Sequence, residues 1–207
     1  DNAFVLAHTT GDIDGSNTGI DIDVRDSLTI LNGGGLGANT YGAGDAGDIR
    51  IKAGGIKMLG VLQTPYYSSS FIASQVLASG DSGDIRIETG NLEIRDASVI
   101  TTTSWNSQGG NAGNLEVIAD SVLIAGPESS PDPFVTDFTG MDTSSGWAAG
   151  NGGDLSITAD NLTMMNRASL DGSAYGPGRG GDMTINAGNV EVLKGSAMIA
   201  SAFGSGD

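Results

Sequence analysis

The sequence predicts an all-β protein, a parallel β-helix (β-solenoid) of about seven coils with three short strands in each coil. Each coil spans roughly 28–40 residues, within the range typical of repeat architectures. Two observations support this fold. The motif Gly-x-small-Gly-(Asp/Asn)-apolar-x-apolar occurs five times, at Gly44–Ile51 and then beginning at Gly80, Gly110, Gly150 and Gly178. Between the motifs, apolar and polar residues alternate over four or five positions, which is typical of strands with one buried face. Such a repeat, built from short alternating segments, indicates a stacked array rather than a closed globule.

The second glycine of each motif marks the repeats, which begin near residues 19, 47, 83, 113, 153 and 181. Successive differences between these numbers are 28, 36, 30, 40 and 28. We therefore expect residues 1–207 to form a single β-helix segment in which the shortest spacing corresponds to one bare coil. The longer repeats carry side-loop insertions at about 61–71 and 126–138, which leave the coil after its second strand and emerge along one edge.

Three apolar positions in each repeat predict the three strands. The first pair is Ile20/Ile22, Ile49/Ile51, Ile85/Ile87, Leu115/Val117, Leu155/Ile157 and Met183/Ile185. The second pair is Leu28/Ile30, Ile56/Met58, Leu92/Ile94, Val122/Ile124, Leu162/Met164 and Val190/Val192. The third position is Leu36, Ile72, Ile100, Leu170 and Met198, with Asp142 in the repeat from 113. After the second pair comes a residue that, in five of the six repeats, tolerates the left-handed backbone of a sharp corner: Asn32, Gly60, Asp96, Gly126, Asn166 and Lys194.

Composition excludes several classes of function. The chain has 34 glycines, no cysteine, only nine basic residues and a net charge of −16. Because phosphate groups are bound mainly through Lys and Arg, nucleic acid is not expected as a partner. No apolar run reaches the ~20 residues of a membrane helix, so membrane insertion is not expected either. The chain begins without Met and ends within a repeat, at Gly204–Asp207, which indicates a processed product or a segment of a longer protein.

Large side chains recur at one place in successive repeats, just after the third apolar position. They are Tyr41, Leu77, Trp105, Trp147, Tyr175 and Phe203. The favoured interpretation is packing, because stacked aromatic rings stabilise one another by about 0.5–1.5 kcal/mol per pair beyond burial. The alternative is an exposed stripe that stacks on the sugars of a polysaccharide.

Acidic and amide side chains also recur beside the glycines, most clearly at Asp45, Asp48, Asp81 and Asp84. Like charges on neighbouring strands ~4.8 Å apart repel each other unless their oxygens are satisfied. We expect these oxygens to accept backbone N–H groups at the glycine-rich corner. Bridging by Ca²⁺ is the alternative, so no cofactor is expected unless Ca²⁺ is bound.

The two insertions are the least repetitive parts of the chain and are the expected contact sites, because loops on a rigid scaffold often carry recognition. One contains Tyr66, Tyr67 and Phe71, and the other contains Phe134 and Phe138. These aromatic side chains either meet a partner or fold back onto the coil. The sequence leaves both possibilities open.

Catalysis has little support in the sequence. Glu128, Asp132, Asp137 and Asp142 could supply acid and base groups, but nearby carboxylates are unsurprising in a chain with 25 acidic residues. The single histidine, His8, lies in the irregular first repeat. No nucleophile elbow, phosphate loop or pair of metal-ligating histidines is present. The chain is therefore not expected to be an enzyme.

Residues 83–117 read Gly-Asp-Ile-Arg-Ile-Glu-Thr-Gly-Asn-Leu-Glu-Ile-Arg-Asp-Ala-Ser-Val-Ile-Thr-Thr-Thr and close on Gly-Gly-Asn-Ala-Gly-Asn-Leu-Glu-Val. This pattern, which extends over about residues 19–207, resembles the β-helical shaft of filamentous-haemagglutinin-type exoproteins, the two-partner-secretion family. The resemblance implies a right-handed β-helix, export through a dedicated outer-membrane partner of a Gram-negative-type bacterium, and a role as a surface or secreted adhesin.

Together these features predict a structural and adhesive segment of an extracellular fibre protein. The regular repeats lead us to expect either end-to-end self-association or continuation in a longer chain, since exposed strand edges recruit further strands. A surface glycan or a protein receptor is the expected partner of the side loops. The alternative is a glycan-binding or glycan-cleaving β-helix that uses the aromatic column and the loop carboxylates.

Overall fold

A computed structural model describes residues 3–8, 19–63, 66–105, 110–128, 138–147 and 149–204, and for 61–63 and 66–68 it describes the backbone only. All the regular elements in these ranges are strands. The long strands are β2 (Ile20–Leu31), β4 (Ile49–Leu59), β8 (Ile85–Arg95), β10 (Leu115–Ala125), β12 (Leu155–Met165) and β14 (Met183–Val192). The short strands are β1 (Phe4–Leu6), β3 (Gly35–Gly37), β7 (Phe71–Ala73), β9 (Val99–Thr101), β11 (Gly140–Asp142), β13 (Ser169–Asp171) and β15 (Ala197–Ile199). β5 (Val61–Gln63) and β6 (Tyr66–Ser68) form a separate pair.

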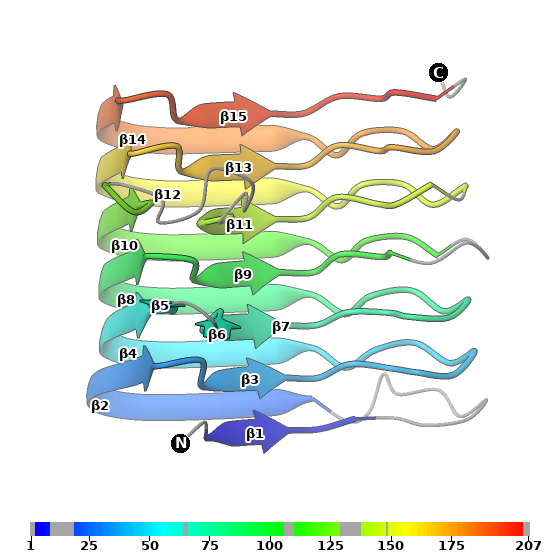
Figure 1. The fold of residues 1–207 in the computed structure, drawn as a ribbon, viewed down its shortest axis with the longest axis horizontal. Coiled ribbons are helices and arrows are strands. Elements are labelled where there is room, and N and C mark those ends of the chain that lie inside the picture. The colour runs from blue at the N-terminus through cyan, green and yellow to red at the C-terminus, as the bar shows by residue number, and fades with distance from the viewer. Residues whose placement is uncertain are drawn as a thin grey trace.

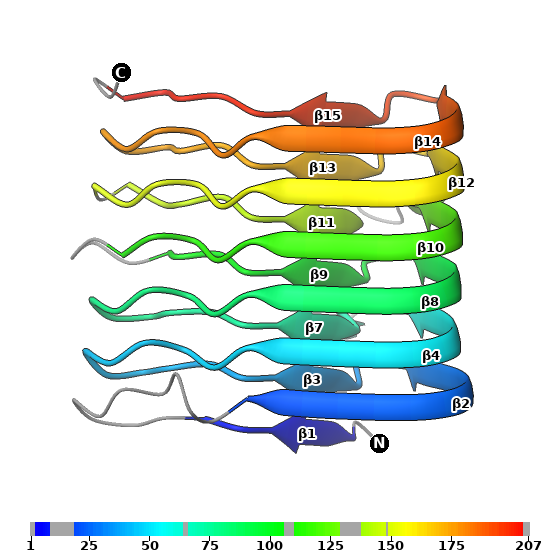
Figure 2. The same cartoon turned by 180° about the vertical axis from the view of Figure 1, so that it is seen from behind.

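The long and short strands form two parallel sheets. The six-stranded sheet has the order β14-β12-β10-β8-β4-β2, and the seven-stranded sheet has the order β1-β3-β7-β9-β11-β13-β15. Because long and short strands alternate along the chain, each repeat lies one level above the previous one (Figures 1 and 2). This arrangement confirms the predicted all-β, parallel, solenoid-like fold. Within the described residues, no helix is long and apolar enough to cross a membrane.

The predicted rows of apolar residues are in register from one repeat to the next. Ile49 pairs with Ile20 and Ile85, and Leu115 pairs with Ile85 and Leu155. These side chains point into a common core and are almost fully buried. The sheet therefore continues through all six long strands with the hydrophobic row intact.

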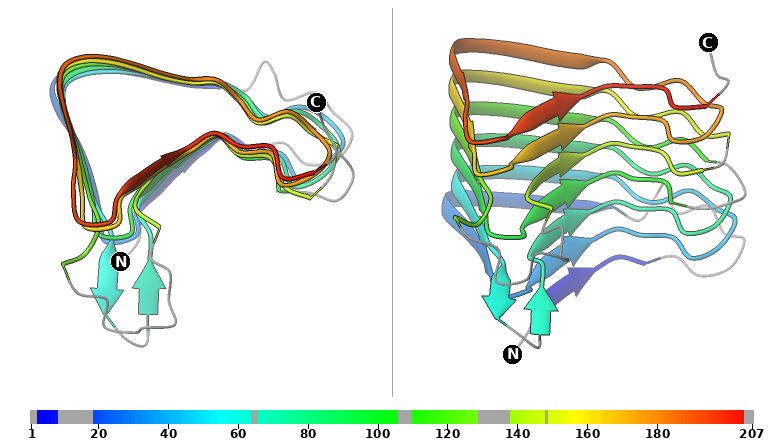
Figure 3. Two further views of the ribbon diagram at one scale, coloured as in Figure 1. Left: turned by 90° about the horizontal axis from the view of Figure 1, so that it is seen from above. Right: turned by 45° about the horizontal axis from the view of Figure 1, so that its top comes forward.

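The number of strands in each repeat differs from the prediction. The first and second apolar pairs belong to one long strand of 10–12 residues, which bends at a corner (Figure 3, left), so a repeat contains two strands rather than three. The pairing of β4 with β8 continues across this bend, from Ala53 with Thr89 to Gly55 with Asn91. Backbone hydrogen bonding to both neighbours thus keeps the strand intact where the sequence alone indicated a break.

In the first repeat the predicted apolar pairs are in register with those of β4, but Gly19, the glycine predicted to begin the repeat, is offset by one residue. β2 contains an extra residue between Val24 and Ser27, where its register with β4 shifts. As a result Ile20 pairs with Ile49, so Gly19 aligns with Asp48 and not with Gly47. The spacing between Gly19 and Gly47 concealed this bulge, because it equals the spacing between Gly153 and Gly181 in a repeat that has no bulge.

The third apolar position of the repeat from 113 is also one residue away from the prediction. Met141, not Asp142, pairs with Ile100 and Leu170, and its side chain is fully buried. Asp142 lies on the opposite face of the short strand, in register with Thr101 and Asp171. The insertion before β11 hides this register, because its length does not reveal where the strand resumes.

Beyond the short strands, the chain runs outward and returns in a thin extension, which we call the arm; in the repeat from 153 it comprises residues 172–182 (Figure 3, left). The two halves of the arm are joined by backbone hydrogen bonds, such as Gly153 N to Thr143 O at 2.8 Å and Gly181 N to Gly172 O at 2.8 Å. Small residues occupy the inside of the arm, because the two backbones lie too close for large side chains. Their hydroxyl groups bond the opposite backbone, as Thr143 Oγ1 does to Gly153 O at 2.6 Å.

Replacing Thr143 by Val is expected to lower the free energy of unfolding by about 1–3 kcal/mol, because the fully buried Thr143 no longer donates to Gly153 O while its shape is kept. Urea denaturation followed by circular dichroism would measure the change. Thr143→Ser retains the hydroxyl and is the matched control. A loss in Thr143→Ser without a loss in Thr143→Val would show that the methyl group, rather than the hydrogen bond, matters.

Both insertions begin at the same corner, where a long strand ends. The first contains the antiparallel β5–β6 hairpin, which projects away from the stack after β4 (Figure 3). The second follows β10, which is separated from β4 in the sheet by β8 alone. Ala125 pairs with Arg95 and Gly140 pairs with Val99. The chain advances fifteen residues from Ala125 to Gly140, but only four from Arg95 to Val99 in the neighbouring repeat. Eleven residues of this repeat are therefore extra at this corner. The twelfth extra residue of this repeat is therefore in the arm and not in the loop.

Candidate functional site

The glycine motif forms the tightest contact between repeats. One column contains Gly44, Gly80, Gly110, Gly150 and Gly178, and the other contains Gly47, Gly83, Gly113, Gly153 and Gly181. A Cβ atom added to a glycine of the first column would lie 1.8–2.2 Å from the carbonyl oxygen of the glycine one repeat below. In the second column the corresponding distance is 1.9–2.4 Å. Both glycines of the motif are therefore required by the close stacking of one backbone on the next.

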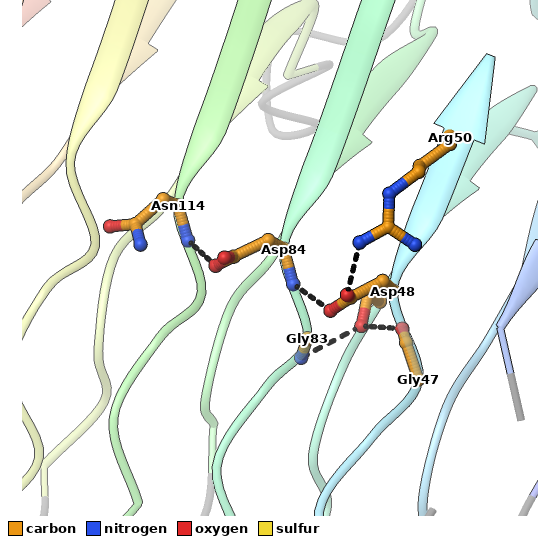
Figure 4. A network of polar contacts seen from close by, with 7 residues as sticks. Gly47, Asp48, Arg50, Gly83, Asp84 and Asn114 are labelled. Atoms are coloured by element: carbon orange, nitrogen blue, oxygen red, sulfur yellow. Dashed lines mark hydrogen bonds and ion pairs between the residues drawn. The ribbon is translucent and has the colours of Figure 1, made fainter. Parts of the chain in front are cut away.

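The acidic residues of the motif satisfy backbone donors of the following repeat. Asp48 Oδ1 accepts a hydrogen bond from Asp84 N at 3.0 Å, and Asp84 Oδ1 accepts one from Asn114 N at 2.7 Å (Figure 4). The ladder continues with Asn114 Oδ1 accepting from Asp154 N at 2.9 Å. Since both Asn and Asp serve in this ladder, it requires an oxygen acceptor and not a negative charge. Arg50 additionally pairs with Asp48 at 2.9 Å.

A second ladder lies three residues earlier in the motif. Asp45 Oδ1 accepts from Asp81 N at 2.8 Å, and Asp81 Oδ1 accepts from Asn111 N at 2.7 Å. The four acids considered as Ca²⁺ ligands, Asp45, Asp48, Asp81 and Asp84, thus all bind backbone N–H groups, as expected for a corner-capping role. Among the residues that the structure describes, no three or more His, Asp or Glu side chains are grouped to hold a metal ion.

The roles of charge and hydrogen bonding in these ladders can be separated at Asp84. Asp84→Ala is expected to lower the free energy of unfolding by about 0.5–1.5 kcal/mol, because Asn114 N loses its acceptor. Asp84→Asn keeps an oxygen acceptor, and it removes a negative charge next to Asp48, so its stability should equal or exceed that of the wild type. Thermal denaturation of both variants, with and without Ca²⁺, would measure these effects. A stabilisation by Ca²⁺ that both substitutions abolish would instead support a metal role.

The aromatic column is a stack of rings rather than a row of free faces. Tyr175 stacks on Phe203 of the next repeat, with 5.2 Å between ring centroids and 6° between planes. On its other side Tyr175 stacks on Trp105 at 6.0 Å and 24°, although these residues are two repeats apart. Because both faces of Tyr175 are covered by other rings, this geometry favours the packing interpretation.

Gly146 makes the contact between Trp105 and Tyr175 possible. The bridges from Ser104 to Ser145 and from Ser145 to Ala174 place Gly146 at the position that Trp105 and Tyr175 occupy in their repeats. Trp147 is therefore displaced by one residue; it leans against Tyr175 at 6.1 Å and is 78% exposed. Tyr41, at the other end of the column, packs edge-on against His8 with a centroid distance of 5.3 Å.

The aromatic residues of the insertions do not form one site. Phe71 belongs to β7 rather than to a loop, and its ring covers Gly35 and stacks on Phe4 at 5.9 Å. Tyr66 and Tyr67 lie in β6, of which the backbone alone is described. Phe138 is partly buried just before β11, as expected for a ring that folds back. Phe134 lies outside the described residues.

A pair of carboxyl groups beside the aromatic column was not identified from the sequence. Asp142 and Asp171 are neighbours in register on the outer face of β11 and β13. Asp171 Oδ2 accepts a hydrogen bond from the Tyr175 hydroxyl at 2.8 Å, and burial together with this carboxylate raises the pKa of Tyr175 to about 12. The spacing of Asp171 and Tyr175 in the sequence could have indicated their hydrogen bond. The repeat pattern, however, assigns Asp142 to the interior row and so does not place it beside Asp171.

Burial raises the pKa of Asp142 to about 6. Hydrogen bonding from Ser144, whose backbone N lies 2.9 Å from Asp142 Oδ1, opposes this shift, and the neighbouring Asp171 adds to it. Asp142 therefore takes up a proton as the pH falls through about 6. Of the other candidate acids, Glu128 is exposed at the start of the second insertion, and Asp132 and Asp137 lie outside the described residues. Of the four candidate catalytic acids, Glu128 and Asp142 alone therefore lie within the described residues.

Comparison with known proteins identifies no relative of this chain. No protein-family model, no curated protein and no solved structure matches it. The function of the chain therefore has to be inferred from its own residues and their arrangement.

Proposed function

We propose that this chain is a stiff shaft segment of an extracellular fibre protein, built as a right-handed β-helix of about seven coils. The observation that carries the proposal is the continuous parallel register from β2 to β14 and from β1 to β15, which includes every repeat that the structure describes. A shaft needs this register, because each repeat is held by both neighbours.

The contacts between repeats support stiffness. Backbone ladders, two glycine columns and two side-chain ladders link each repeat to the next, so bending would stretch several hydrogen bonds at once. Side chains inside the stack are small or aliphatic and are closely packed, and interiors of this density resist compression. The net charge of −16 keeps such rods apart in solution and suits an exterior rich in cations.

The two insertions are the proposed contact surfaces for a surface glycan or a protein receptor. They leave one corner of the stack and lie two strands apart in the long sheet, so a single partner could touch both. The β5–β6 hairpin stands out from the regular outline of the other repeats (Figure 3). The resemblance of residues 83–117 to filamentous-haemagglutinin-type exoproteins supports the same function, together with export to the cell surface.

Two measurements test the proposal. Small-angle X-ray scattering of the purified chain should give the profile of a compact, rigid particle, and a profile of a flexible chain would overturn the shaft. Adhesion of beads coated with the chain should then decrease when residues 61–68 are deleted. The repeats that begin at Gly19 and Gly153 close the same corner without such a segment, so the deletion should preserve the circular dichroism spectrum. Unchanged adhesion in a folded deletion variant would exclude the first insertion as a contact surface.

Glycan binding at the aromatic column is a second candidate function, and it rests on the exposure of Trp147. Trp105, Tyr175 and Phe203 form the stack, and Trp147 lies beside it, tilted against Tyr175. One face of Trp147 therefore remains available to a sugar. If this function is correct, binding to a panel of polysaccharides should be lost in Trp147→Ala. Leu77→Ala is the matched control, because Leu77 occupies the same column and is also exposed. Equal binding by both variants would contradict this candidate.

A further inference from the structure

One row of side chains on the outer face of the short strands contains two acids. Asp142 of β11 and Asp171 of β13 are partners in register. The other members of this row among the described residues are Leu6, Gly37, Ala73, Thr101 and Ile199. The repeat itself therefore does not need an acid at this position, unlike the glycine corner, where Asp or Asn recurs in successive repeats. The pair calls for a role that is specific to these two repeats.

The two carboxyl groups are not bridged by a donor that lies between their repeats. Each accepts a hydrogen bond from the backbone two residues further along its own repeat, Asp142 from Ser144 N and Asp171 from Ser173 N, both at 2.9 Å. In the corner ladders, by contrast, an N–H group of the next repeat lies between successive acids. Within the part of the chain that the structure describes, no Lys or Arg forms an ion pair with either carboxylate. Two like charges on strands ~4.8 Å apart thus lack a positive partner.

The pair is also largely withdrawn from water. Asp171 is 8% exposed, and burial is the main cause that raises the pKa of Asp142. The Tyr175 side chain extends back to Asp171, to which its hydroxyl donates at 2.8 Å, and Trp105 and Phe203 cover the two faces of its ring. A buried pair of like charges is stabilised only when a proton or a cation joins it.

A buried hydroxyl group without a hydrogen-bond partner borders this pair. Ser173 Oγ is fully buried and has no partner among the residues that the structure describes. The positions equivalent to Asp171 and Ser173 two repeats earlier are Thr101 and Thr103, whose hydroxyl groups are 3.0 Å apart. Side chains at these two positions therefore meet on one face, which directs the Ser173 hydroxyl toward the carboxyl pair. Since buried polar groups are almost always hydrogen-bonded, an unpartnered one indicates an ion or a water at the site.

We propose that Asp142 and Asp171 bind one Ca²⁺ ion between β11 and β13, with Ser173 Oγ as a neutral ligand and water completing the coordination. Carboxylate and hydroxyl oxygens are ligands for a hard cation, whereas zinc and copper sites are built from nitrogen and sulfur. Ca²⁺ accepts the irregular set of oxygens that two neighbouring strands offer, whereas Mg²⁺ demands a near-ideal octahedron. The ion neutralises the pair, and it ties β11, the strand that resumes the stack after the second insertion, to the next repeat. This inference does not depend on the proposed shaft.

Thermal denaturation of the whole chain, in EDTA and in Ca²⁺ at equal ionic strength, tests the site. With Ca²⁺ in excess over its dissociation constant, the unfolding temperature of the wild type should rise by about 2–5 °C. Asp142→Asn keeps an acceptor for Ser144 N but removes one charged ligand, so it should fold in EDTA and lose the rise. Asp160→Asn is the matched control, because it removes the same charge from an exposed position and should keep the rise.

Terbium luminescence locates the ion without relying on stability. Tb³⁺ replaces Ca²⁺ at oxygen sites and emits when it is excited through nearby aromatic rings, which Tyr175 and Trp105 provide here. The wild type should show emission that added Ca²⁺ displaces. Asp142→Asn should need at least about tenfold more Tb³⁺ for the same emission, which corresponds to about 1.4 kcal/mol of binding free energy.

Three results would count against the proposal. Equal stabilisation of the wild type and Asp142→Asn by Ca²⁺ would overturn the site, because the ion would then bind elsewhere on this acidic chain. A wild type without a Ca²⁺-dependent rise and without displaceable emission would overturn the binding. A rise of the same size in Mg²⁺ would overturn the assignment to Ca²⁺. The shaft is tested separately, by small-angle scattering in EDTA, and stands or falls independently of these results.

Discussion

Gly113→Ala is expected to abolish the cooperative folding of the stack or to destabilise it by on the order of 3–5 kcal/mol. A Cβ atom at this position would lie 2.1 Å from the carbonyl oxygen of Gly83 and 2.6 Å from its carbonyl carbon. Both atoms belong to the backbone, so no side chain can rotate away. Relief requires the two repeats to separate, which would lengthen the neighbouring hydrogen bonds, including Asn114 N to Asp84 Oδ1 at 2.7 Å.

Gly55→Ala is the matched control for this prediction. Gly55 lies in β4, and an added Cβ atom would meet Asn91 O at 3.8 Å, an ordinary van der Waals contact. Alanine there should be neutral or slightly stabilising, because it reduces the conformational entropy of the unfolded chain. Urea denaturation of both variants would give the two free energies of unfolding. Similar losses at both positions would show that glycine columns do not determine the stability of the stack.

Much of the fold could be predicted because its strongest constraints recur in the sequence. A glycine is needed wherever one backbone lies directly over another, and an apolar residue is needed wherever a side chain enters the shared core. Each constraint applies once per repeat, so both appear as periodic residues. The predicted pairs Ile49/Ile51 and Ile85/Ile87 therefore coincide with paired, buried positions.

The errors occurred where a repeat gains residues whose position within it is ambiguous. The spacing between Gly113 and Gly153 shows that twelve residues are extra, but it does not show that eleven precede β11 and one lies beside Gly146. Assigning all twelve to the loop moves Asp142 into the interior row that Met141 occupies. The bulge between Val24 and Ser27 escaped detection for a related reason. It adds one residue to the first repeat, but Gly19 lies one residue after the position equivalent to Gly47. The two effects cancel, so the spacing between Gly19 and Gly47 looks normal.

The candidate sites were less predictable than the fold. Sequence spacing placed Trp105, Trp147 and Tyr175 on one side of the stack, but it did not fix the planes of their rings. The ring planes decide whether sugars could stack, and here Gly146 lets Trp105 close onto Tyr175. The carboxyl pair was missed because its two members come from repeats of different length, so it depends on register rather than on a motif.

Asp142→Asn is expected to stabilise the protein above neutral pH by roughly 2–3 kcal/mol, at about 1.4 kcal/mol for each unit of pKa shift. The pKa of Asp142 is raised from 3.8 to about 6 in the folded protein, chiefly by burial, and the nearby Asp171 carboxylate contributes. At pH 8 the folded protein therefore carries a partly buried charge that costs free energy. Asparagine removes this charge, and its side-chain oxygen can still accept the hydrogen bond from Ser144 N.

The pH dependence of stability provides the sharper measurement. The pKa of Asp142 is higher in the folded state than in the unfolded state, so as the pH falls through about 6 the folded state binds a proton first. The free energy of unfolding therefore rises as the pH falls, until the unfolded state is protonated as well at about pH 4. The difference in free energy of unfolding between Asp142→Asn and the wild type should therefore shrink from pH 8 to pH 4. Asp160→Asn removes the same charge from an exposed position of β12, and its difference from the wild type should stay small throughout. A constant difference for Asp142→Asn across this range would show that the Asp142 carboxyl group titrates equally in the folded and unfolded states.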